Sequence, residues 1–191
     1  FKQKTAYEIL TCDWSSDVCS SDLAILQMLN HGLITSGLFL LVGIGYERTH
    51  DREIAKMGGW ASRTPVYAAL FGFFLFASVG LPGLSGFAGE FLVLLGAFIV
   101  NPMVAGAATL VMILAAVYLL WMYQRVFTGP LSPFLKGFGS HLVDVTPTEI
   151  ITLTPLLVMI VAFGIMPTLL TASFGPSVSQ FLLAAFSGVT P

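Results

Sequence analysis

The chain has 191 residues, of which 56% are hydrophobic and only 9% are charged, and its formal net charge at pH 7 is −2. Its mean hydropathy is +0.89. A soluble domain carries about 25% charged residues, so this composition excludes an ordinary soluble protein and indicates a membrane protein. The near balance of charges also argues against binding to nucleic acid, which requires a basic surface.

The first 23 residues differ in composition from everything that follows. They read FKQKTAYEILTCDWSSDVCSSDL, are polar, and contain both cysteines of the chain. They lack the apolar core of a signal peptide, and they resemble translated sequencing-adapter read-through. We therefore expect residues 1–23 to be a non-native artefact outside the fold, the alternative being a genuine polar lead-in. Residues 24–191 contain no cysteine, so they indicate nothing about redox compartment.

Several apolar stretches are long enough to cross a membrane, which requires about 20 residues for about 30 Å of hydrocarbon. Residues 24–46 fit one span, and residues 103–124 fit another that ends in an aromatic cluster typical of the membrane interface. Residues 150–174 fit a further span, in which two prolines are expected to produce kinks. The tail 176–191 is shorter and less apolar, and we expect it to lie at the interface.

The segment 66–101 is too long for one straight span, because its 36 residues at about 1.5 Å each would extend roughly 54 Å. It is interrupted by three helix breakers, Pro82, Gly83 and Gly86. Divided there, it predicts helices over 66–81 and 86–101, each about 24 Å long. These pieces are either two short spans or the two halves of one discontinuous helix.

The positive charges help to decide between these alternatives. After residue 23, all six Lys and Arg residues lie in two loops, 47–64 and 125–149. If 66–101 makes one crossing, the span 103–124 brings the chain back, and both loops with all six charges lie on the same side of the membrane. If 66–101 makes two crossings, the loops lie on opposite sides and the charges are divided four against two. The positive-inside rule favours the first arrangement. We therefore expect an all-α membrane protein with about four transmembrane helices, one of them discontinuous, both basic loops in the cytoplasm and the C-terminus on the opposite side.

Glu90 is the only Asp, Glu, Lys, Arg or His between Arg63 and Arg125. A carboxylate near the bilayer centre costs about 2.5–3.5 kcal/mol on insertion scales, so an intramembrane acid indicates function by default. Burial favours the neutral acid. The start of the second half-helix, for which Ser85 is the expected N-cap, favours the anion. Such a carboxyl can take up and release a proton within the membrane, the alternative being a protonated group that only ties helices together.

Polar side chains also recur along the first span. Gln27, His31 and Thr35 are four residues apart and therefore share one helix face, and Asn30 adjoins that face. On an otherwise apolar helix, this stripe is expected to face the protein interior or trapped water. The imidazole of His31 is suited to relaying protons, the alternative being a neutral histidine that holds two helices together.

Other kinds of site are not indicated by the sequence. It contains no phosphate-binding glycine loop, zinc motif or Ser-His-Asp arrangement, and no convincing motif for a redox cofactor. We therefore expect neither a metal site nor a residue that catalyses redox chemistry. The candidates for function are the polar residues within the spans.

Two long stretches carry a resemblance to a known family. MLNHGLITSGLFLLVGIGYERTHDREIAKMGG (28–59) and ASVGLPGLSGFAGEFLVLLGAF (77–98) are similar to the chain M, or chain 4, family of NADH:quinone oxidoreductase, which is complex I. These chains are antiporter-like proton-translocating subunits, related to Mrp-type cation/proton antiporters and to membrane-bound hydrogenases. The glutamate of GEF favours the chain M type, since chains L and N usually carry lysine at this place. The resemblance extends over essentially all of residues 24–191.

The resemblance implies a fold of about fourteen helices with two inverted repeats, each containing one broken helix, of which residues 24–191 would be the C-terminal third. Glu90 would match the acidic residue of the broken twelfth helix, at the outlet of a central hydrophilic axis. His31 would match a histidine of the eleventh helix on the same axis. The family's first-repeat glutamate and central lysines are absent from this chain, which alone is therefore not expected to pump protons.

The resemblance further implies that this chain holds no cofactor, while NADH, FMN, iron–sulfur clusters and quinone bind to other subunits. The expected partners are other complex I membrane subunits, in particular neighbouring antiporter-like chains, together with the lipid bilayer and protons. The expected location is a bacterial inner membrane, and the chain would belong to an enzyme only as a subunit of the whole translocase. The alternatives are an Mrp-type cation/proton antiporter subunit and a non-conducting membrane scaffold.

Overall fold

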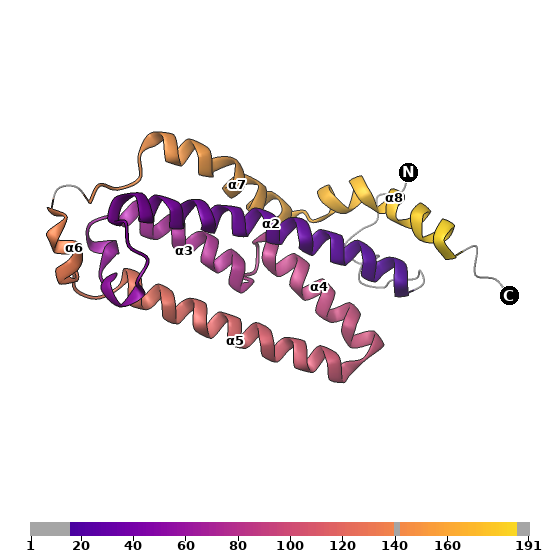
Figure 1. Ribbon diagram of the computed structural model, residues 1–191. Helices are drawn as coiled ribbons and strands as arrows, with labels where there is room; N and C mark the ends of the chain where they lie inside the picture. The colour runs from indigo at the N-terminus through magenta and orange to yellow at the C-terminus, as the bar shows by residue number, and fades with distance from the viewer. Residues whose placement is uncertain (1–15, 140–141, 187–191) are drawn as a thin grey trace.

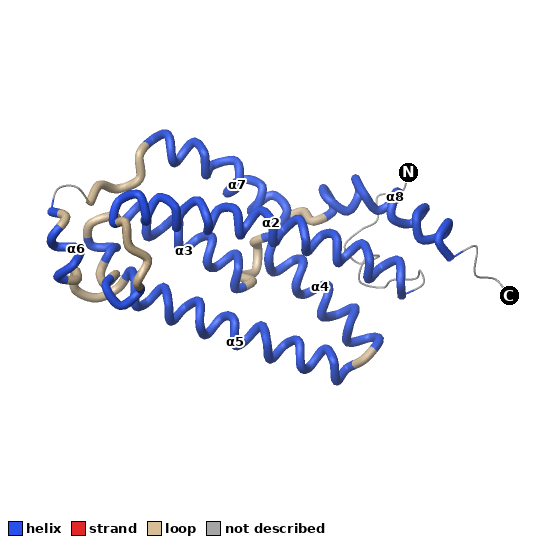
Figure 2. The backbone as a smooth tube through the Cα atoms, in the orientation of Figure 1, coloured by secondary structure: helices blue, strands red, loops and turns tan. Residues whose placement is uncertain are grey.

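The computed structural model of the chain describes residues 16–139 and 142–186. Within these residues all regular structure is helical (Figures 1 and 2). The α-helices, with two 3₁₀ helices η1 and η2, are in chain order α2 (Ser16–Thr49), η1 (Ile54–Lys56), η2 (Trp60–Ser62), α3 (Pro65–Val79), α4 (Ser85–Val100), α5 (Pro102–Phe127), α6 (Pro133–Gly137), α7 (Pro147–Ile165) and α8 (Thr168–Phe186).

The start of α2 bears on the stretch that we expected to lie outside the fold. Residues 1–15 of that stretch lie outside the described residues. Residues 16–23 form the first turns of α2, so this helix begins before residue 24, where the composition changes. At its other end α2 continues to Thr49, three residues beyond the expected end of the first span.

The long helices form one bundle around α2 (Figure 1). α2 contacts α3, α4, α7 and α8, and α5 contacts α3 and α4. α3 and α4 follow one another along the bundle, antiparallel to α2, and α5 then returns beside them. The loop before α3 and the loop after α5 therefore lie at the same end, which we call the loop end. The predicted all-α membrane fold with one discontinuous helix is confirmed.

Three described helical segments are long and apolar enough to cross a membrane, Leu23–Thr49, Pro102–Phe127 and Pro147–Ile165. α3 and α4 have 15 and 16 residues. At about 1.5 Å per residue, neither is long enough to span about 30 Å of hydrocarbon alone. Placed in series, the two short helices are together long enough for one further crossing.

A tight turn separates α3 from α4. α3 ends at Gly80, whose φ of 83° suits glycine because glycine has no Cβ. The following four residues form a β-turn in which the Leu84 N–H donates to the Leu81 carbonyl at 3.1 Å. Pro82 takes the second position, and Gly83, with a φ of 94°, takes the third, as in a type II turn. Local backbone preferences thus produce the break where the sequence predicts it.

The expected single span over 150–174 is wrong, because the structure divides it into α7 and α8. Met166 lies between them with φ −129° and ψ 72°, outside the helical region. The residue before a proline is disfavoured in that region, and Pro167 follows. The expected separate tail over 176–191 is also wrong as far as Phe186, since these residues continue α8.

Helix starts follow local signals in the sequence. α3, α5, α6 and α7 each begin at a proline, which suits the first helical position because the missing N–H would have no partner there. The Asn101 side chain accepts the N–H groups of Met103 and Val104 at the start of α5. Thr146 and Glu149 form a capping box at the start of α7.

A dense aromatic cluster lies toward the loop end. It joins η2, α3 and α5 and consists of Trp60, Tyr67, Phe71, Tyr123 and Phe127, with ring centroids of its contacting pairs 4.7–6.5 Å apart. Aromatic pairs at such distances add to the stabilisation that burial provides. The cluster therefore anchors α3, which is the first half of the broken helix and extends from the cluster to the break.

Candidate functional site

Glu90 lies on the second turn of α4, and its side chain reaches back toward the break. Helical side chains lean toward the helix N-terminus, and Oε2 of Glu90 lies 2.9 Å from the position that a Cβ on Gly80 would occupy. The residue is partly buried. The carboxyl is thus placed between the C-terminal end of α3 and the N-terminal end of α4, which carry opposite partial charges. The sequence led us to expect two influences on the Glu90 carboxyl, burial and the start of α4. The structure adds a third, the carbonyl end of α3.

α2 and α4 approach each other closely at the start of α4. Asn30 is fully buried, and its Nδ2 donates to the backbone carbonyl of Ser85 at 2.8 Å. Gly89 permits this approach, because a Cβ at that position would overlap Oε1 of Gln27. We call this contact, formed by Gln27, Asn30, Ser85 and Gly89, the α2–α4 seam.

Three side-chain oxygens of the seam are buried without a hydrogen-bond partner within the described structure, namely Gln27 Oε1, Asn30 Oδ1 and Ser85 Oγ. Most buried polar atoms in proteins have a partner, so each exception requires an explanation. Leaving such an atom unpaired costs about 1–3 kcal/mol. The seam is therefore a polar site with unused hydrogen-bonding capacity, one residue away from Glu90 along α4.

The break is covered by protein only in part, since Leu81, Pro82 and Gly83 are exposed on the described segment while the following residues, Leu84 to Gly86, are buried. A Cβ on Gly86 would overlap the Ala77 carbonyl oxygen, so the first turn of α4 packs directly on the last turns of α3. From the other side, a Cβ on Gly164 of α7 would overlap backbone atoms of Gly83 and Leu84. Irregular backbone at membrane depth is tolerated where it is buried in protein. These glycines supply that cover by letting backbones come close.

The residues of the predicted polar stripe on α2 differ in their burial within the described segment. His31 is exposed on the described segment, and the Thr35 hydroxyl donates to the His31 carbonyl at 2.7 Å within the same helix. Gln27 is partly buried, and Asn30 alone among the four is fully buried. That the stripe faces the interior of a longer protein or trapped water stays a prediction, since the described segment by itself encloses only Asn30 fully. Consecutive residues are about 100° apart around a helix, so α4 covers Asn30 and leaves its neighbour uncovered.

Ser85 is not the N-cap of α4, contrary to expectation. Leu84, with φ −108° and ψ 155°, holds that position, and the cap has no side-chain hydrogen bond. Because the turn at the break leaves Leu84 extended, Ser85 is already the first helical residue, and its side chain is fully buried. The sequence signal located the helix start correctly but assigned the cap to the wrong residue.

A second polar group lies at the loop end. Nη2 of Arg48 is 2.9 Å from Oε2 of Glu149 and 3.0 Å from the backbone carbonyl of Asp144. The Asp144 carboxylate accepts the N–H groups of Val66 and Tyr67, each at 2.9 Å, and so caps α3. The sequence gives no indication of this group, because Arg48 and Glu149 are 101 residues apart and no local motif links them.

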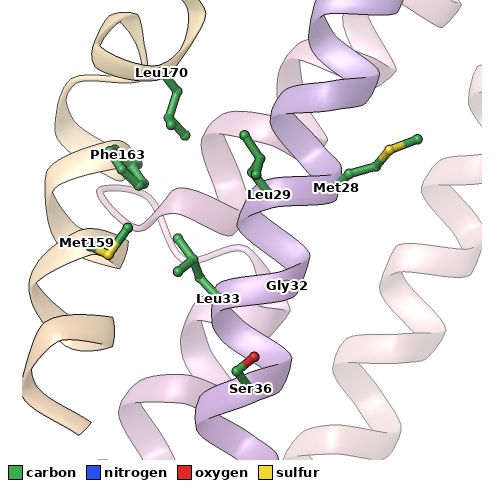
Figure 3. Close-up of a pocket in the computed structure, with 8 residues that line it drawn as sticks. All are labelled: Met28, Leu29, Gly32, Leu33, Ser36, Met159, Phe163 and Leu170. Atoms are coloured by element: carbon green, nitrogen blue, oxygen red, sulfur yellow. The ribbon is translucent and has the colours of Figure 1, made fainter. Parts of the chain in front are cut away.

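An apolar groove of about 330 Å³ lies between α2, α7 and α8 (Figure 3). It is lined by Met28, Leu29, Gly32, Leu33, Ser36, Met159, Phe163 and Leu170. None of these side chains is acidic, basic or an imidazole, so the groove offers no group that exchanges protons at neutral pH. Within the part of the chain that the structure describes, no three His, Cys, Asp or Glu residues gather in a way that could hold a metal ion.

Comparisons with known proteins all point to relatives of one family. Residues 8–132 match the family described as NADH:quinone oxidoreductase/Mrp antiporter, TM. The chain is 49% identical to NADH-quinone oxidoreductase subunit M of Rhodobacter capsulatus over 161 residues, which are 84% of this chain and 31% of that protein. It is 43% identical to NADH-ubiquinone oxidoreductase chain 4 of Arabidopsis thaliana over 160 residues, or 83% and 32% of the two chains.

The fold is similar to that of a chain in the structure of respiratory complex I from Thermus thermophilus with bound NADH. The TM-score is 0.68 at 34% sequence identity, and the match covers 82% of this chain and 34% of that chain. The present chain thus spans about a third of the length of the curated relatives it matches.

The family match takes in both halves of the broken helix and the whole α2–α4 seam, because residues 8–132 include all of α2, α3, α4 and α5. The match begins within the polar residues 1–23, which were expected to lie outside the fold, and it ends before α7. More than half of the chain is matched, and the relatives agree with the observed fold. The chain therefore belongs to the NADH:quinone oxidoreductase/Mrp antiporter transmembrane family.

Proposed function

We propose that this chain is a segment of a membrane subunit of NADH:quinone oxidoreductase, and that it takes part in moving protons across the membrane as quinone is reduced. The observation that carries the proposal is a partly buried carboxyl, Glu90, placed between the two ends of a broken helix. The relatives named as subunit M and chain 4 of this enzyme support the choice of complex.

The position of Glu90 suits a proton carrier. Its side chain is not fully enclosed by this segment, so water or a neighbouring protein group can reach it. The ends of α3 and α4 act on its anionic form in opposite senses. A group that transfers protons must be able to hold and release them at the working pH, which such opposed effects permit. Glu90 is thus proposed to take up a proton from one side of the break and release it to the other.

His31 is proposed as a second carrier, on α2. An ionisable side chain is costly against lipid and normally faces protein or a wet cavity. Its exposed position on this segment therefore favours a contact with other parts of the same subunit. The remaining polar side chains near it are proposed to support the path, namely Gln27, Asn30, Thr35 and Ser85.

The rest of the proposed path lies outside this chain. The upstream lysine and glutamate carriers are assigned to the remaining two thirds of the subunit, and NADH, FMN, iron–sulfur clusters and quinone to other subunits. This chain thus contributes transport to the enzyme and contains no redox centre. We place it in a bacterial inner membrane beside neighbouring antiporter-like subunits. The basic loops 47–64 and 125–149 are placed in the cytoplasm and the C-terminus on the opposite side.

The test is the substitution Glu90→Gln in the full-length subunit within the assembled complex. We expect proton pumping per NADH oxidised to fall several-fold while the complex still assembles, because the amide keeps the shape of the side chain but cannot exchange a proton. The measurement is the pH gradient formed by membrane vesicles, divided by the rate of NADH oxidation. Glu47→Gln is a matched control, because Glu47 is exposed at the loop end of α2.

Normal pumping by an assembled Glu90→Gln complex would refute the proposed role and favour a structural carboxyl in a non-conducting scaffold. Cation/proton exchange that depends on Glu90 but needs no NADH would favour the Mrp-type alternative, which the family description also includes. Both results are accessible with the same vesicles.

A further inference from the structure

The α2–α4 seam has hydrogen-bonding groups that this segment does not use. Asn30 and Ser85 are fully buried, and each keeps a side-chain oxygen without a partner within the described structure. Nδ2 of Asn30 is engaged with the Ser85 carbonyl at 2.8 Å, which fixes the orientation of the amide and leaves Oδ1 as the free acceptor. The seam therefore presents an amide acceptor and a hydroxyl from two different helices.

These oxygens are buried within the described segment itself. Residues elsewhere in a longer protein, or in a partner subunit, consequently cannot reach them without displacing the parts of this segment that bury them. Only a small molecule can complete their hydrogen bonds within the intact seam. A buried water bound by two to four polar partners is the usual solution in proteins.

Gly89 provides the place for such a molecule. The position that a Cβ on Gly89 would fill is instead taken by Oε1 of Gln27, and Nδ2 of Asn30 lies 3.0 Å from the same position. Gln27 is only partly buried, and its side chain has three rotatable bonds, so it can turn outward from the seam. Its departure leaves a small space over Gly89, beside the buried amide of Asn30.

We propose that the space over Gly89 is a gated hydration site, in which one water molecule replaces the Gln27 side chain and hydrogen-bonds to Asn30 and Ser85. Gln27 closes the site by lying over Gly89 and opens it by turning outward. The inference rests on the proposed function in one respect, because water must have access to the exposed side of α2 where Gln27 and His31 lie.

The seam favours water over a metal cation. Its three free oxygens are neutral amide and hydroxyl groups, and the first turn of α4 carries the partial positive charge of a helix N-terminus. That charge opposes a cation, whereas water can both accept and donate hydrogen bonds. The ligand is therefore assigned as water rather than sodium or another ion.

The experiment is a high-resolution cryo-EM map of the complete complex, compared with a map of the Gly89→Ala variant. We expect solvent density over Gly89, within hydrogen-bonding distance of Asn30 Oδ1 or Ser85 Oγ, and its loss when a methyl group fills the space. Gly96→Ala is the matched control, since Gly96 lies two turns further along α4 and its Cβ would make an ordinary 3.8 Å contact with Leu23. Its map should retain the density.

A second variant keeps the inference testable if Gly89→Ala does not assemble. Gln27→Ala removes the side chain that closes the site, and we expect stronger solvent density over Gly89 than in the wild-type map. The inference is overturned if ordered side chains surround an empty seam in both the wild-type and Gln27→Ala maps. It is also overturned if both free oxygens are bonded to protein groups in the wild-type map.

These outcomes are separate from the test of Glu90. A dry seam together with pumping that depends on Glu90 would overturn the hydration site and leave the proposed function intact. A hydrated seam together with pumping that is indifferent to Glu90→Gln would overturn the proposed function and leave the hydration site as a structural feature.

Discussion

The two ends of α3 are built in opposite ways. At its N-terminal end, the Asp144 carboxylate accepts two backbone N–H groups, and Arg48 pairs with Glu149 beside it. At its C-terminal end, the Glu90 carboxyl lies against Gly80, next to a seam whose side-chain oxygens are buried without partners. Both ends combine buried and exposed residues, so the difference between them is hydrogen-bond pairing rather than burial.

Pairing at the loop end is not complete, since Nη1 of Arg48 and Nε1 of Trp60 are also buried without a partner. Arg48 nevertheless makes two other hydrogen bonds, and Trp60 packs on Tyr67 and Phe127. Polar groups that are satisfied hold one arrangement, whereas unsatisfied groups can gain by changing partners. The comparison teaches that polar groups at the loop end largely satisfy one another, whereas those beside the break keep hydrogen-bonding capacity that the described segment does not use.

The largest structural effect is expected from Gly86→Ala, which acts on the break. The new Cβ overlaps the carbonyl oxygen of Ala77, and backbone cannot move aside as a side chain can. Overpacking of this kind costs about 1–3 kcal/mol or more, so we expect a clear loss of assembled subunit and a lower Tm. Gly96→Ala serves as the control. Wild-type stability of Gly86→Ala would show that α3 and α4 are not packed as tightly as described.

At the loop end, Arg48→Met should lower stability without changing the number of protons pumped per NADH. Breaking a buried ion pair costs about 3–5 kcal/mol. The Arg48 and Glu149 side chains keep 11% and 22% of their surface exposed, which reduces the expected loss to about 1–2 kcal/mol. A double-mutant cycle with Glu149→Gln, followed by Tm, measures the coupling. Additive effects of the two substitutions would argue against a stabilising pair.

Asp144→Ala tests the cap of α3 and should have a somewhat smaller effect, about 1 kcal/mol, as for other N-terminal caps. The variant leaves the N–H groups of Val66 and Tyr67 without their acceptors. Asp144→Asn keeps one carbonyl acceptor and should lose less. The measurement is Tm of the assembled complex, and an Asn variant as unstable as the Ala variant would contradict the capping role.

The smallest effect is expected at the exposed pair of Lys56 and Asp51, whose Nζ and Oδ2 are 2.7 Å apart. The hydrogen bond from Lys56 lowers the pKa of Asp51 below its ordinary value of 3.8. A carboxyl with a lowered folded-state pKa contributes stability above its unfolded pKa and loses that contribution as pH falls through the folded pKa. The small difference in Tm between wild type and Lys56→Met should therefore be constant above about pH 3.8, decrease as pH falls below that value, and disappear once pH is below the lowered folded-state pKa of Asp51.

The control for the Lys56 experiment is Lys136→Met, because Lys136 is an exposed lysine of α6. Its difference from wild type should not follow the titration of Asp51. A Lys56→Met difference that stays constant down to the lowest pH would contradict the assigned pair. Added salt should also reduce the Lys56 effect, since exposed charges are screened.

The discontinuous helix could be predicted because proline and glycine act on the backbone where they stand. The same reasoning was available at Pro167, where the preceding residue leaves the helix. For Pro167 the sequence predicts only a kink within one span, because the whole run 150–174 is apolar and long enough to cross a membrane. Length and composition indicate that a segment can cross a membrane, but they do not determine whether its helix continues.

The positions of the polar side chains on α2 and α4 could be predicted only in part. Glu90 was identified because it is an isolated acid in an apolar stretch, and the structure places it at the break. Gly89 was not singled out, because its importance arises from Gln27 lying over it. Asp144 was missed as a cap of α3 for a similar reason, since it is 78 residues from Val66.

Local sequence was sufficient to determine the membrane class of this protein, the place of the helix break and the acid beside it, because these depend on composition and on the conformations open to proline and glycine. Tertiary structure decided that Asn30 is buried while His31 is exposed, and that Ser85 points into the seam. A neighbouring helix covers only part of the circumference of α2. Which residues it covers is determined by the packing of the whole bundle.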